Sequence, residues 1–450
     1  MRICVTTTIE AMASPLLSYS EAAGQIQRYI QTLGEGGELP ALTEVVPLDR
    51  ATGRVLAEAI YSDRDQPPFP RSTRDGYACR AAEASSHRLL ALTGHVRAGE
   101  AAPGTLGSGE VWEIMTGAAV PEGADAVFMV EHSEHDSGQA SGSVRLLAPR
   151  TIEVGENIVP RGAEAHAGNL LVAPGTRIAS AQIALAAQCG YSQLQVAPRP
   201  RVAILSTGDE LVSVDSIPGP IQIRNSNSPM LAALVTTAGG EPIVLPAVPD
   251  QEEALDAVLR QILTLGVDML LITGGISMGR FDLVEDALKR ANARFVFAGV
   301  AIQPGKPVAF GQIPATESGG SACIRPEIPV LALPGNPISS AVTFHLFAAP
   351  ILAALGRNSD RAPRFALARM AHDFSSWRGK SGLTRFLPAR CNFEAGFETG
   401  LKAETGPEVQ VLAWHGSGDI ATFARCNCFL VVPPDCEEVA QGSMVRILLI

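Results

Sequence analysis

The chain has 450 residues, of which 46% are hydrophobic and 18% are charged, a composition that supports several packed cores and excludes a largely disordered protein. Its 46 acidic residues outnumber the 35 basic ones, and the formal net charge of -11 repels a phosphate backbone, which argues against a nucleic-acid-binding protein. A small anionic ligand is still allowed, because backbone N–H groups and helix N-termini bind phosphate locally.

The sequence favours a cytoplasmic protein that has no membrane anchor. Residues 1–17 contain one Arg and an interrupted apolar stretch, which differs from a secretory signal, and we interpret them as a leader. The longest apolar run, Ser339 to Gly356, is interrupted by His345 and Pro350 and predicts a buried helix rather than a membrane span. The 8 cysteines are scattered and form no zinc-binding set, as expected for reduced thiols.

The first half of the chain predicts a mixed region and a β-rich domain. Ser18 or Ser20 can cap a helix with one apolar face, which begins a mixed α/β N-terminal region formed by residues 18–61 and 166–197. A proline-rich run near residue 66 forbids regular structure and marks a boundary. Residues 62–165 contain many glycines and short strand-like segments, so we expect a β-rich domain there.

Residues 198–358 predict a doubly wound α/β domain. Short apolar strands alternate with amphipathic helices, and strands buried on both faces indicate a parallel sheet. Ligands bind to such sheets at the loops that follow the C-terminal ends of the strands. Residues 359–450 return to short strand-like segments and predict a C-terminal β domain, either a small barrel or a sandwich. The expected fold class is therefore multidomain α/β plus β.

Two glycine-bearing loops at predicted strand ends are candidate anion sites. Residues 273–279 read Thr-Gly-Gly-Ile-Ser-Met-Gly and residues 333–340 read Leu-Pro-Gly-Asn-Pro-Ile-Ser-Ser, and their N–H groups can form an anion-binding nest. A tight turn or a serine helix cap would explain either loop alone, but two on one sheet edge favour a ligand. Residues 303–307 lack the hydroxyl residue of a Walker loop after Lys306, although Lys306 can still pair with a phosphate.

Three carboxylates lie on loops or helix starts of the central domain: Glu210, Asp250 and Asp282. Oxygen ligands of this kind hold Mg²⁺, which bridges to phosphate oxygens. Asp250 has an alternative role as a helix cap, because Glu253 follows it as in a capping box. In the β-rich domain, the motifs around Asp75 and Thr116 predict turns, and their spacing assigns no chemistry.

Seven motifs occur in an order that resembles the MoeA/gephyrin family, the molybdopterin molybdenumtransferases. They are residues 75–78, 115–117, 121–127, 206–211, 274–279, 304–307 and 333–337. The resemblance covers residues 18–450 and implies an enzyme that inserts molybdate into adenylylated molybdopterin, with release of AMP and a requirement for Mg²⁺. It further implies an elongated homodimer, in which each active site lies between the α/β and C-terminal domains of one subunit and the β-rich domain of the other.

The resemblance also assigns roles to residues. Asp75 and Thr116 would be contributed by the partner subunit, and Glu210, Asp250 and Asp282 would surround molybdate, the metal and the adenylyl phosphate. The implied ligand-binding residues are Gly275, Ser277, Lys306, Pro334, Gly335, Pro337 and Ser417. Three positions depart from the pattern of many relatives, which affects metal affinity and individual roles: Arg74, Glu164 and Gln303.

Two other functions stay open. A molybdopterin adenylyltransferase shares the α/β domain, but the additional domains at 18–195 and 360–450 argue against it. A non-catalytic scaffold is the other, although nothing resembles the extra fused domain and long linker of a gephyrin-like anchor. The expected partners are small-molecule substrates, a second copy of the chain and other molybdenum cofactor enzymes, with neither nucleic acid nor membrane.

Overall fold

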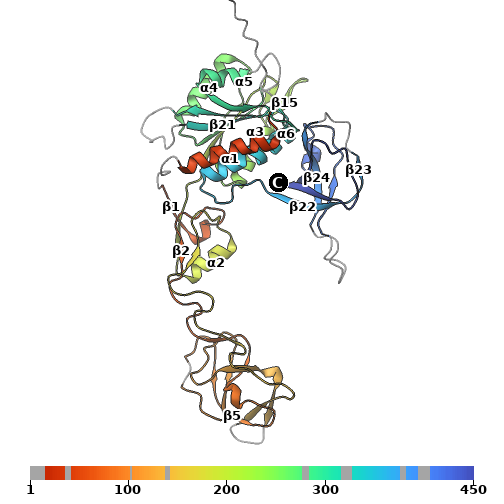
Figure 1. Ribbon diagram of the computed structural model, residues 1–450. Coiled ribbons are helices and arrows are strands. Elements are labelled where there is room, and N and C mark those ends of the chain that lie inside the picture. Colours follow the sequence, from red (N-terminus) through yellow and green to blue (C-terminus); the bar gives the residue numbers. More distant parts are fainter. Residues whose placement is uncertain are drawn as a thin grey trace, which may run out of the picture.

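The computed structural model describes residues 16–35, 42–101, 104–136, 142–275, 283–315, 327–375, 382–393 and 406–450. The molecule is elongated, with the central sheet and the C-terminal β domain at one end, the β-rich part at the other, and a small region between them (Figure 1). Each of the three large parts contains one six-stranded sheet. This architecture is the multidomain α/β plus β fold that the sequence predicts.

The central sheet orders its strands β16-β13-β17-β21-β20-β18. The strands are β13 (Arg201–Ser206), β16 (Glu241–Val244), β17 (Met269–Thr273), β18 (Arg294–Ala298), β20 (Ala309–Pro314) and β21 (Glu327–Leu333). The first four in the sheet are parallel, whereas β20 runs antiparallel to both β21 and β18. Sequence alone did not predict β20, which contains Gly311 and ends at Pro314, two residues that are uncommon inside strands.

Helices cover both faces of this sheet, as expected for a doubly wound domain. They are α1 (Tyr19–Glu35), α3 (Asn227–Thr237), α6 (Pro337–Thr343) and α7 (Ala349–Leu355) on one face, with α4 (Glu252–Thr264) and α5 (Leu283–Arg290) on the other. Alternate residues of β13 point to opposite faces, so that Val202 and Ile204 pack with the first group and Ala203 and Leu205 with the second.

The N-terminal helix α1 is part of the central core. Its buried residues Ile26 and Ile30 join the same apolar cluster as α3, α6 and α7. The Tyr29 ring packs edge-to-face on Phe310 of β20, with 5.2 Å between ring centroids. The first part of segment 18–61 therefore lies on the α/β domain, and only the residues from β1 onward pair with segment 166–197. The apolar stripe of α1 predicts that it packs, but the stripe does not specify the partner.

Among the described residues, one helix is long and apolar enough to cross a membrane, Pro337–Leu355, but 83% of its most apolar window is buried inside the protein. It consists of α6, a π-helical turn at Phe344–Ala348 and α7. This segment is the buried core helix that the interrupted apolar run predicts. The Pro350 ring lacks an N–H group, and the π-helical turn lies directly before it.

The small middle region joins two distant segments. Strand β1 (Glu44–Pro47) pairs with β12 (Gln193–Val196), β2 (Ile60–Tyr61) pairs with β11 (Leu170–Val172), and helix α2 (Ser180–Gln188) packs beside them.

The β-rich sheet comprises β4 (Gly76–Cys79), β5 (Leu90–Val96), β6 (Glu110–Ile114), β7 (Ala126–Met129), β8 (Ser133–Asp136) and β9 (Ser143–Leu146). Short elements beside this sheet are β3 (Arg71–Ser72), β10 (Ile158–Val159), η2 (Ala81–Glu83) and η3 (Val130–His132), whereas η1 (Leu48–Arg50) lies in the middle region.

The C-terminal β domain is a barrel and not a sandwich. Its strands are β22 (Phe365–Met370), β24 (Thr384–Asn392), β25 (Glu408–Val411), β26 (Cys428–Val432) and β28 (Met444–Leu449). Because β24 pairs with both β25 and β26, these five strands close into a ring. Strand β19 (Ile302–Gln303) of the central domain adds to β24 and joins the two domains. The remaining elements are β14 (Leu211–Val212), β15 (Ile223–Arg224), β23 (Phe374–Ser375), β27 (Glu438–Val439) and α8 (Ile420–Phe423).

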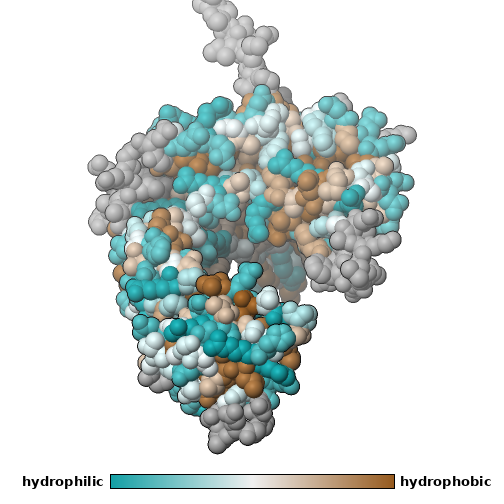
Figure 2. All heavy atoms as spheres, turned by 60° about the horizontal axis from the view of Figure 1, so that its bottom comes forward, coloured by the Kyte–Doolittle hydropathy of each residue, from teal (hydrophilic) through white to brown (hydrophobic). Residues whose placement is uncertain are grey.

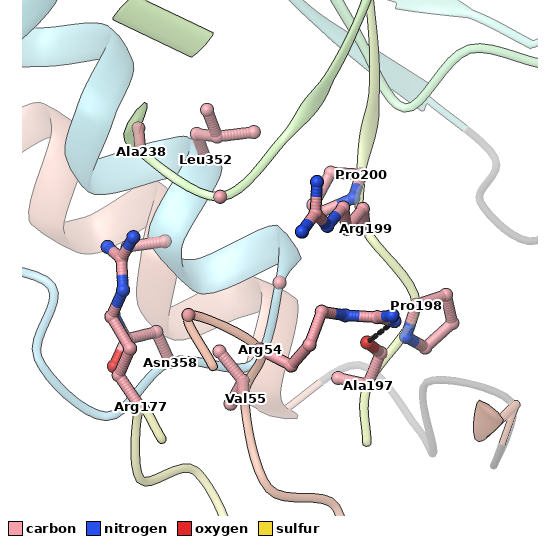
Figure 3. Close-up of a pocket in the computed structure, with 14 residues that line it drawn as sticks. Arg54, Val55, Arg177, Ala197, Pro198, Arg199, Pro200, Ala238, Leu352 and Asn358 are labelled. Carbon is pink, nitrogen blue, oxygen red and sulfur yellow. Dashed lines mark hydrogen bonds between the residues drawn. The ribbon is translucent and has the colours of Figure 1, made fainter. Parts of the chain in front are cut away.

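Arginine side chains line the joint between the middle region and the central domain (Figure 3), and Arg177 bonds across it. Arg54 Nη2 donates to the Ala197 carbonyl at 2.9 Å and pairs with Glu44 at 2.6 Å. Arg177 Nη2 donates to the Thr237 carbonyl at the end of α3, at 2.9 Å. The cavity here has a volume of only about 20 Å³, enough for a water molecule. We interpret this joint as structural, because the predicted ligand residues lie elsewhere.

Candidate functional site

The C-terminal ends of β13, β17 and β21 lie next to one another and place three loops together. Ser206 is paired with Thr273, and Thr273 with Leu333, in parallel register. The loop after β13 is held against its neighbours, since Thr207 N donates to the Thr273 carbonyl at 3.0 Å and Gly208 N to the Val248 carbonyl at 3.2 Å. The loops that follow these strands therefore meet at one edge, as the parallel-sheet rule predicts.

Side-chain hydrogen bonds fix the two glycine-bearing loops to each other. Thr273 Oγ1 donates to the Pro334 carbonyl at 3.1 Å, and Ser340 Oγ donates to the same carbonyl. Asn227 Nδ2 donates to Thr273 Oγ1 at 2.9 Å and to the Gly335 carbonyl at 2.6 Å. A Cβ atom on Gly335 would lie 3.5 Å from the Gly274 Cα, so any side chain at Gly335 would touch the backbone of the other loop. Asn227 is a residue that sequence reasoning missed.

The backbone conformation and the close neighbours at positions 274 and 275 require glycine. The φ angles of Gly274 and Gly275 are 93° and 63°, in the left-handed region that disfavours side chains. A Cβ on Gly275 would lie 2.6 Å from Val284 Cγ2 and 2.7 Å from Thr207 Oγ1, and a Cβ on Gly274 would overlap the Thr207 carbonyl oxygen. The loop thus approaches its neighbours as closely as only glycine allows.

Gly274→Ala is expected to destabilise the protein by about 2–3 kcal/mol, because backbone strain and a clash with a backbone atom add together. Thermal unfolding of the purified protein measures this effect. Gly190→Ala is the matched control: Gly190 has a φ of 83°, but no atom lies within 4 Å of the added Cβ. Equal losses of stability in the two variants would contradict the close approach at Gly274.

Asp250 does not cap helix α4. The helix begins at Glu252 with Gln251 as its N-cap, and no side-chain capping bond is formed, so the capping-box interpretation is wrong. Instead, Asp250 N donates to Asp209 Oδ1 at 3.1 Å. Asp250 Oδ1 and Thr207 Oγ1 are both buried, and neither has a partner of normal hydrogen-bond geometry among the described residues. The Thr207 hydroxyl is close enough to the Asp250 carboxyl to lower its pKa, so the two oxygens face each other.

Asp209, Glu210 and Asp250 form an acidic cluster at this edge of the sheet. Burial raises the pKa of Asp250, the Thr207 hydroxyl partly opposes this shift, and the charges of Asp209 and Glu210 raise it further. The Glu210 carboxylate folds back over Gly208, where an added Cβ would lie 2.7 Å from Glu210 Oε2. Sequence reasoning missed Asp209, although it lies inside the 206–211 motif.

Asp250→Asn is expected to raise the melting temperature at about pH 7.5, well above the ordinary pKa of an aspartate. A raised pKa means that the folded state disfavours the ionised carboxyl. The wild-type protein is therefore most stable at low pH, where Asp250 is protonated, and it loses stability as the pH rises through the raised pKa. The gain should shrink as the pH is lowered and the wild-type carboxyl becomes protonated. A lower melting temperature at neutral pH would contradict this assignment.

Two of the predicted site residues, Ser277 and Asp282, lie outside the described residues. Within the described ranges, no group of three or more His, Cys, Asp or Glu is arranged to hold a metal ion. Glu210 and Asp250 therefore stay predicted metal ligands, with Asp282 as the predicted third.

A cleft of about 1230 Å³ opens between the central domain and the barrel. Three of the predicted ligand residues line it: Lys306, Pro334 and Ser417. The departure at Gln303 also lies on its wall. The Ile338 N–H at the start of α6 donates to the Ser417 carbonyl at 3.0 Å, which ties the two walls together. The predicted Gly335 and Pro337 lie directly beside this lining, and the volume suffices for a large ligand.

Asp75 and Thr116 meet in the β-rich part. Thr116 donates from its backbone N and from its hydroxyl to Asp75 Oδ1, at 2.7 and 3.0 Å. These two bonds lower the pKa of the exposed Asp75 carboxyl, with the backbone N–H as the larger cause. Within one chain this pair is far from the acidic cluster, because the β-rich part lies at the opposite end of the molecule (Figure 1).

The fold and the site together define a multidomain α/β plus β protein with a large cleft beside the strand ends of its α/β domain. Models of three protein regions match the chain: the MoeA N-terminal region (domain I and II) at residues 17–190, a probable molybdopterin binding domain at 203–354, and the MoeA C-terminal region (domain IV) at 375–450.

Whole proteins match as well. The molybdopterin molybdenumtransferase of Bacillus subtilis is 32% identical over 413 residues, 91% of this chain and 90% of that protein. That of Synechococcus elongatus is 35% identical over 440 residues, 96% of this chain and 99% of that protein. A crystal structure of the molybdopterin biosynthesis moeA protein from Pyrococcus horikoshii OT3 covers 97% of this chain and 100% of its own, with a TM-score of 0.72 and 27% identity. The chain belongs to the molybdopterin molybdenumtransferase family.

Proposed function

We propose that this chain is the transferase that inserts molybdate into adenylylated molybdopterin and releases AMP, in molybdenum cofactor biosynthesis. The observation that carries the proposal is the contact between the loops at Gly274 and Gly335, next to the acidic cluster and beside a large cleft. The proposal is supported by relatives that are named molybdopterin molybdenumtransferase and match nearly the whole chain.

Both reactants are anions, so positioning and neutralisation of charge should dominate catalysis. The backbone N–H groups of the two loops would hold the adenylyl phosphate, and Lys306 in the cleft would pair with an anionic group. We propose Glu210, Asp250 and Asp282 as ligands of Mg²⁺, which would neutralise charge on the phosphoanhydride. The unpartnered oxygens of Asp250 and Thr207 fit this ion, because Mg²⁺ prefers oxygen ligands.

We propose that the active enzyme is a homodimer and that Asp75 and Thr116 act in the site of the other copy. Asp75 cannot reach the acidic cluster of its own chain (Figure 1). The β-rich end is a separate lobe with apolar patches on its surface (Figure 2). Met115 and Val130, the neighbours of this pair, are 44% and 45% exposed, as expected for residues that contact a second copy. A cytoplasmic location and association with other molybdenum cofactor enzymes complete the proposal, with the domain boundaries given above except that α1 (Tyr19–Glu35) belongs to the α/β unit.

Purified protein supplied with adenylylated molybdopterin and molybdate tests the function. We expect AMP release that depends on molybdate and is lost when Mg²⁺ is chelated. Formation of the adenylylated product from ATP and bare molybdopterin would instead favour an adenylyltransferase. An absence of turnover in both assays, with self-association only, would favour the scaffold.

A further inference from the structure

We propose that Trp414 is the surface on which the pterin ring of the substrate stacks. The inference rests on the proposed function, and it adds Trp414 to Ser417 as a substrate-binding residue on the barrel side of the cleft. Trp414 lies three residues after the end of β25, in the segment that lines the cleft opposite the strand-end loops of the central domain.

The two walls of the cleft differ in chemistry. The wall from the central domain carries four polar side chains, Gln303, Lys306, Asn336 and Ser339, among prolines, Gly305 and Ile302. The wall from the barrel is largely apolar, and its side chains are Phe374, Leu383, Arg385, Leu387, Val411, Leu412, Ala413, Trp414, His415 and Ser417. A ligand that fits both walls has a charged end and a flat, less polar end, which describes a phosphorylated molecule with a fused ring.

The backbone around Trp414 is held in place before any ligand binds. On one side, the Thr422 hydroxyl donates to the Ala413 carbonyl at 3.1 Å. On the other side, His415 N donates to Asp419 Oδ2 at 3.1 Å. The indole is half-buried, because it packs against the core of the barrel and against the core of the central domain while it still lines the cleft. Such a ring loses little conformational freedom when a planar ligand stacks on it.

The order of groups along the site selects the pterin rather than the adenine. Strand-end loops of a doubly wound sheet take the phosphate of a nucleotide, so the adenylyl end belongs near Gly274, Gly335 and the acidic cluster. Lys306 lines the same cleft as Pro334, Asn336 and the barrel wall, and there it would pair with the anionic part of the substrate. The ring system that remains is the pterin. Phe374 and Trp414 both line the described barrel wall, and the indole of Trp414 offers the larger aromatic face.

Stacking of a heterocycle on an aromatic side chain changes affinity by roughly 5- to 150-fold. Trp414→Leu is therefore expected to raise the KM for adenylylated molybdopterin by about tenfold or more, with a smaller change in kcat. Trp414→Phe keeps an aromatic face and should retain most of the affinity. Phe393→Leu is the matched control, because Phe393 is an exposed aromatic residue of the same domain that does not line the cleft. Trp414→Leu with an unchanged KM would overturn the inference.

Binding can be measured apart from turnover. The chain has 3 tryptophans, so replacing Trp112 and Trp377 by Phe leaves Trp414 as the single indole fluorophore. A pterin without phosphate should quench its fluorescence saturably, and AMP should not. Quenching by AMP alone would reassign Trp414 to the adenine and overturn the inference. Pterin binding in a protein that never releases AMP would instead reject the proposed function and leave the stacking surface intact.

Discussion

Glu210→Ala is expected to lower molybdate-dependent AMP release by at least about a hundredfold, the loss that follows when one electrostatic group is removed from a preorganised site. The Glu210 carboxylate lies over Gly208 in the acidic cluster, next to the two unpartnered oxygens. Its side chain is exposed, and its contact with strand β15 is a backbone bond, from Ile223 N to the Glu210 carbonyl at 2.9 Å. The substitution should therefore leave the fold unchanged.

Single-turnover AMP release, measured together with the melting temperature, tests this expectation. Glu210→Gln should lose nearly as much activity, because the amide keeps the size of the side chain and removes the charge that attracts a cation. Glu241→Ala is the control, since Glu241 is an exposed acid at the edge strand of the same sheet. Retained turnover in Glu210→Ala would refute a catalytic role for the Glu210 carboxylate. A large fall in melting temperature would show that the side chain stabilises the fold instead.

Mixing Asp75→Asn with Glu210→Ala, each inactive alone, should restore about a quarter of the wild-type activity if each site combines two subunits. Random exchange makes half of the dimers mixed, and one of the two sites in each mixed dimer is then intact. Asparagine keeps an oxygen that can accept the Thr116 hydrogen bonds, so the variant removes charge and preserves the local structure.

A second pair of variants controls for the geometry. Glu210 and Lys306 both lie on the central domain, so a mixed dimer of Glu210→Ala and Lys306→Ala has one lesion in each site and should stay inactive. Activity from this second pair, or none from the first, would contradict a site shared in the proposed way. Sedimentation of the wild-type protein as a monomer would reject the dimer itself.

The central part of the fold could be read from the sequence because its signals are local. Continuous apolar strands and striped helices predict a doubly wound sheet, and the parallel register then brings Gly274 and Gly335 together. The barrel was only half predicted, because its closure depends on the pairing of β24 with β26, which no local pattern specifies. The packing of α1 could not be predicted for a similar reason, since an amphipathic stripe does not identify the surface that it covers.

The site was predictable to a similar degree. Motif resemblance located the residues that line the strand ends and the cleft, including Lys306 and Ser417. It did not point to Asn227, whose amide links the two glycine-bearing loops, or to Trp414, whose exposure to the cleft depends on how the barrel docks. Asp250 shows the opposite error, because its spacing from Glu253 predicted a helix cap that the backbone does not form.

The packing of α1 onto the central sheet has a consequence for how this chain can be divided. The α/β unit is assembled from two stretches separated by more than a hundred and fifty residues, so it cannot be excised as one continuous piece. A recombinant fragment of residues 198–358 would leave the face around Phe310 uncovered and prone to aggregate. Gene fusions or truncations that remove the first helix should therefore damage the ligand-binding half of the protein rather than the segment next to the cut.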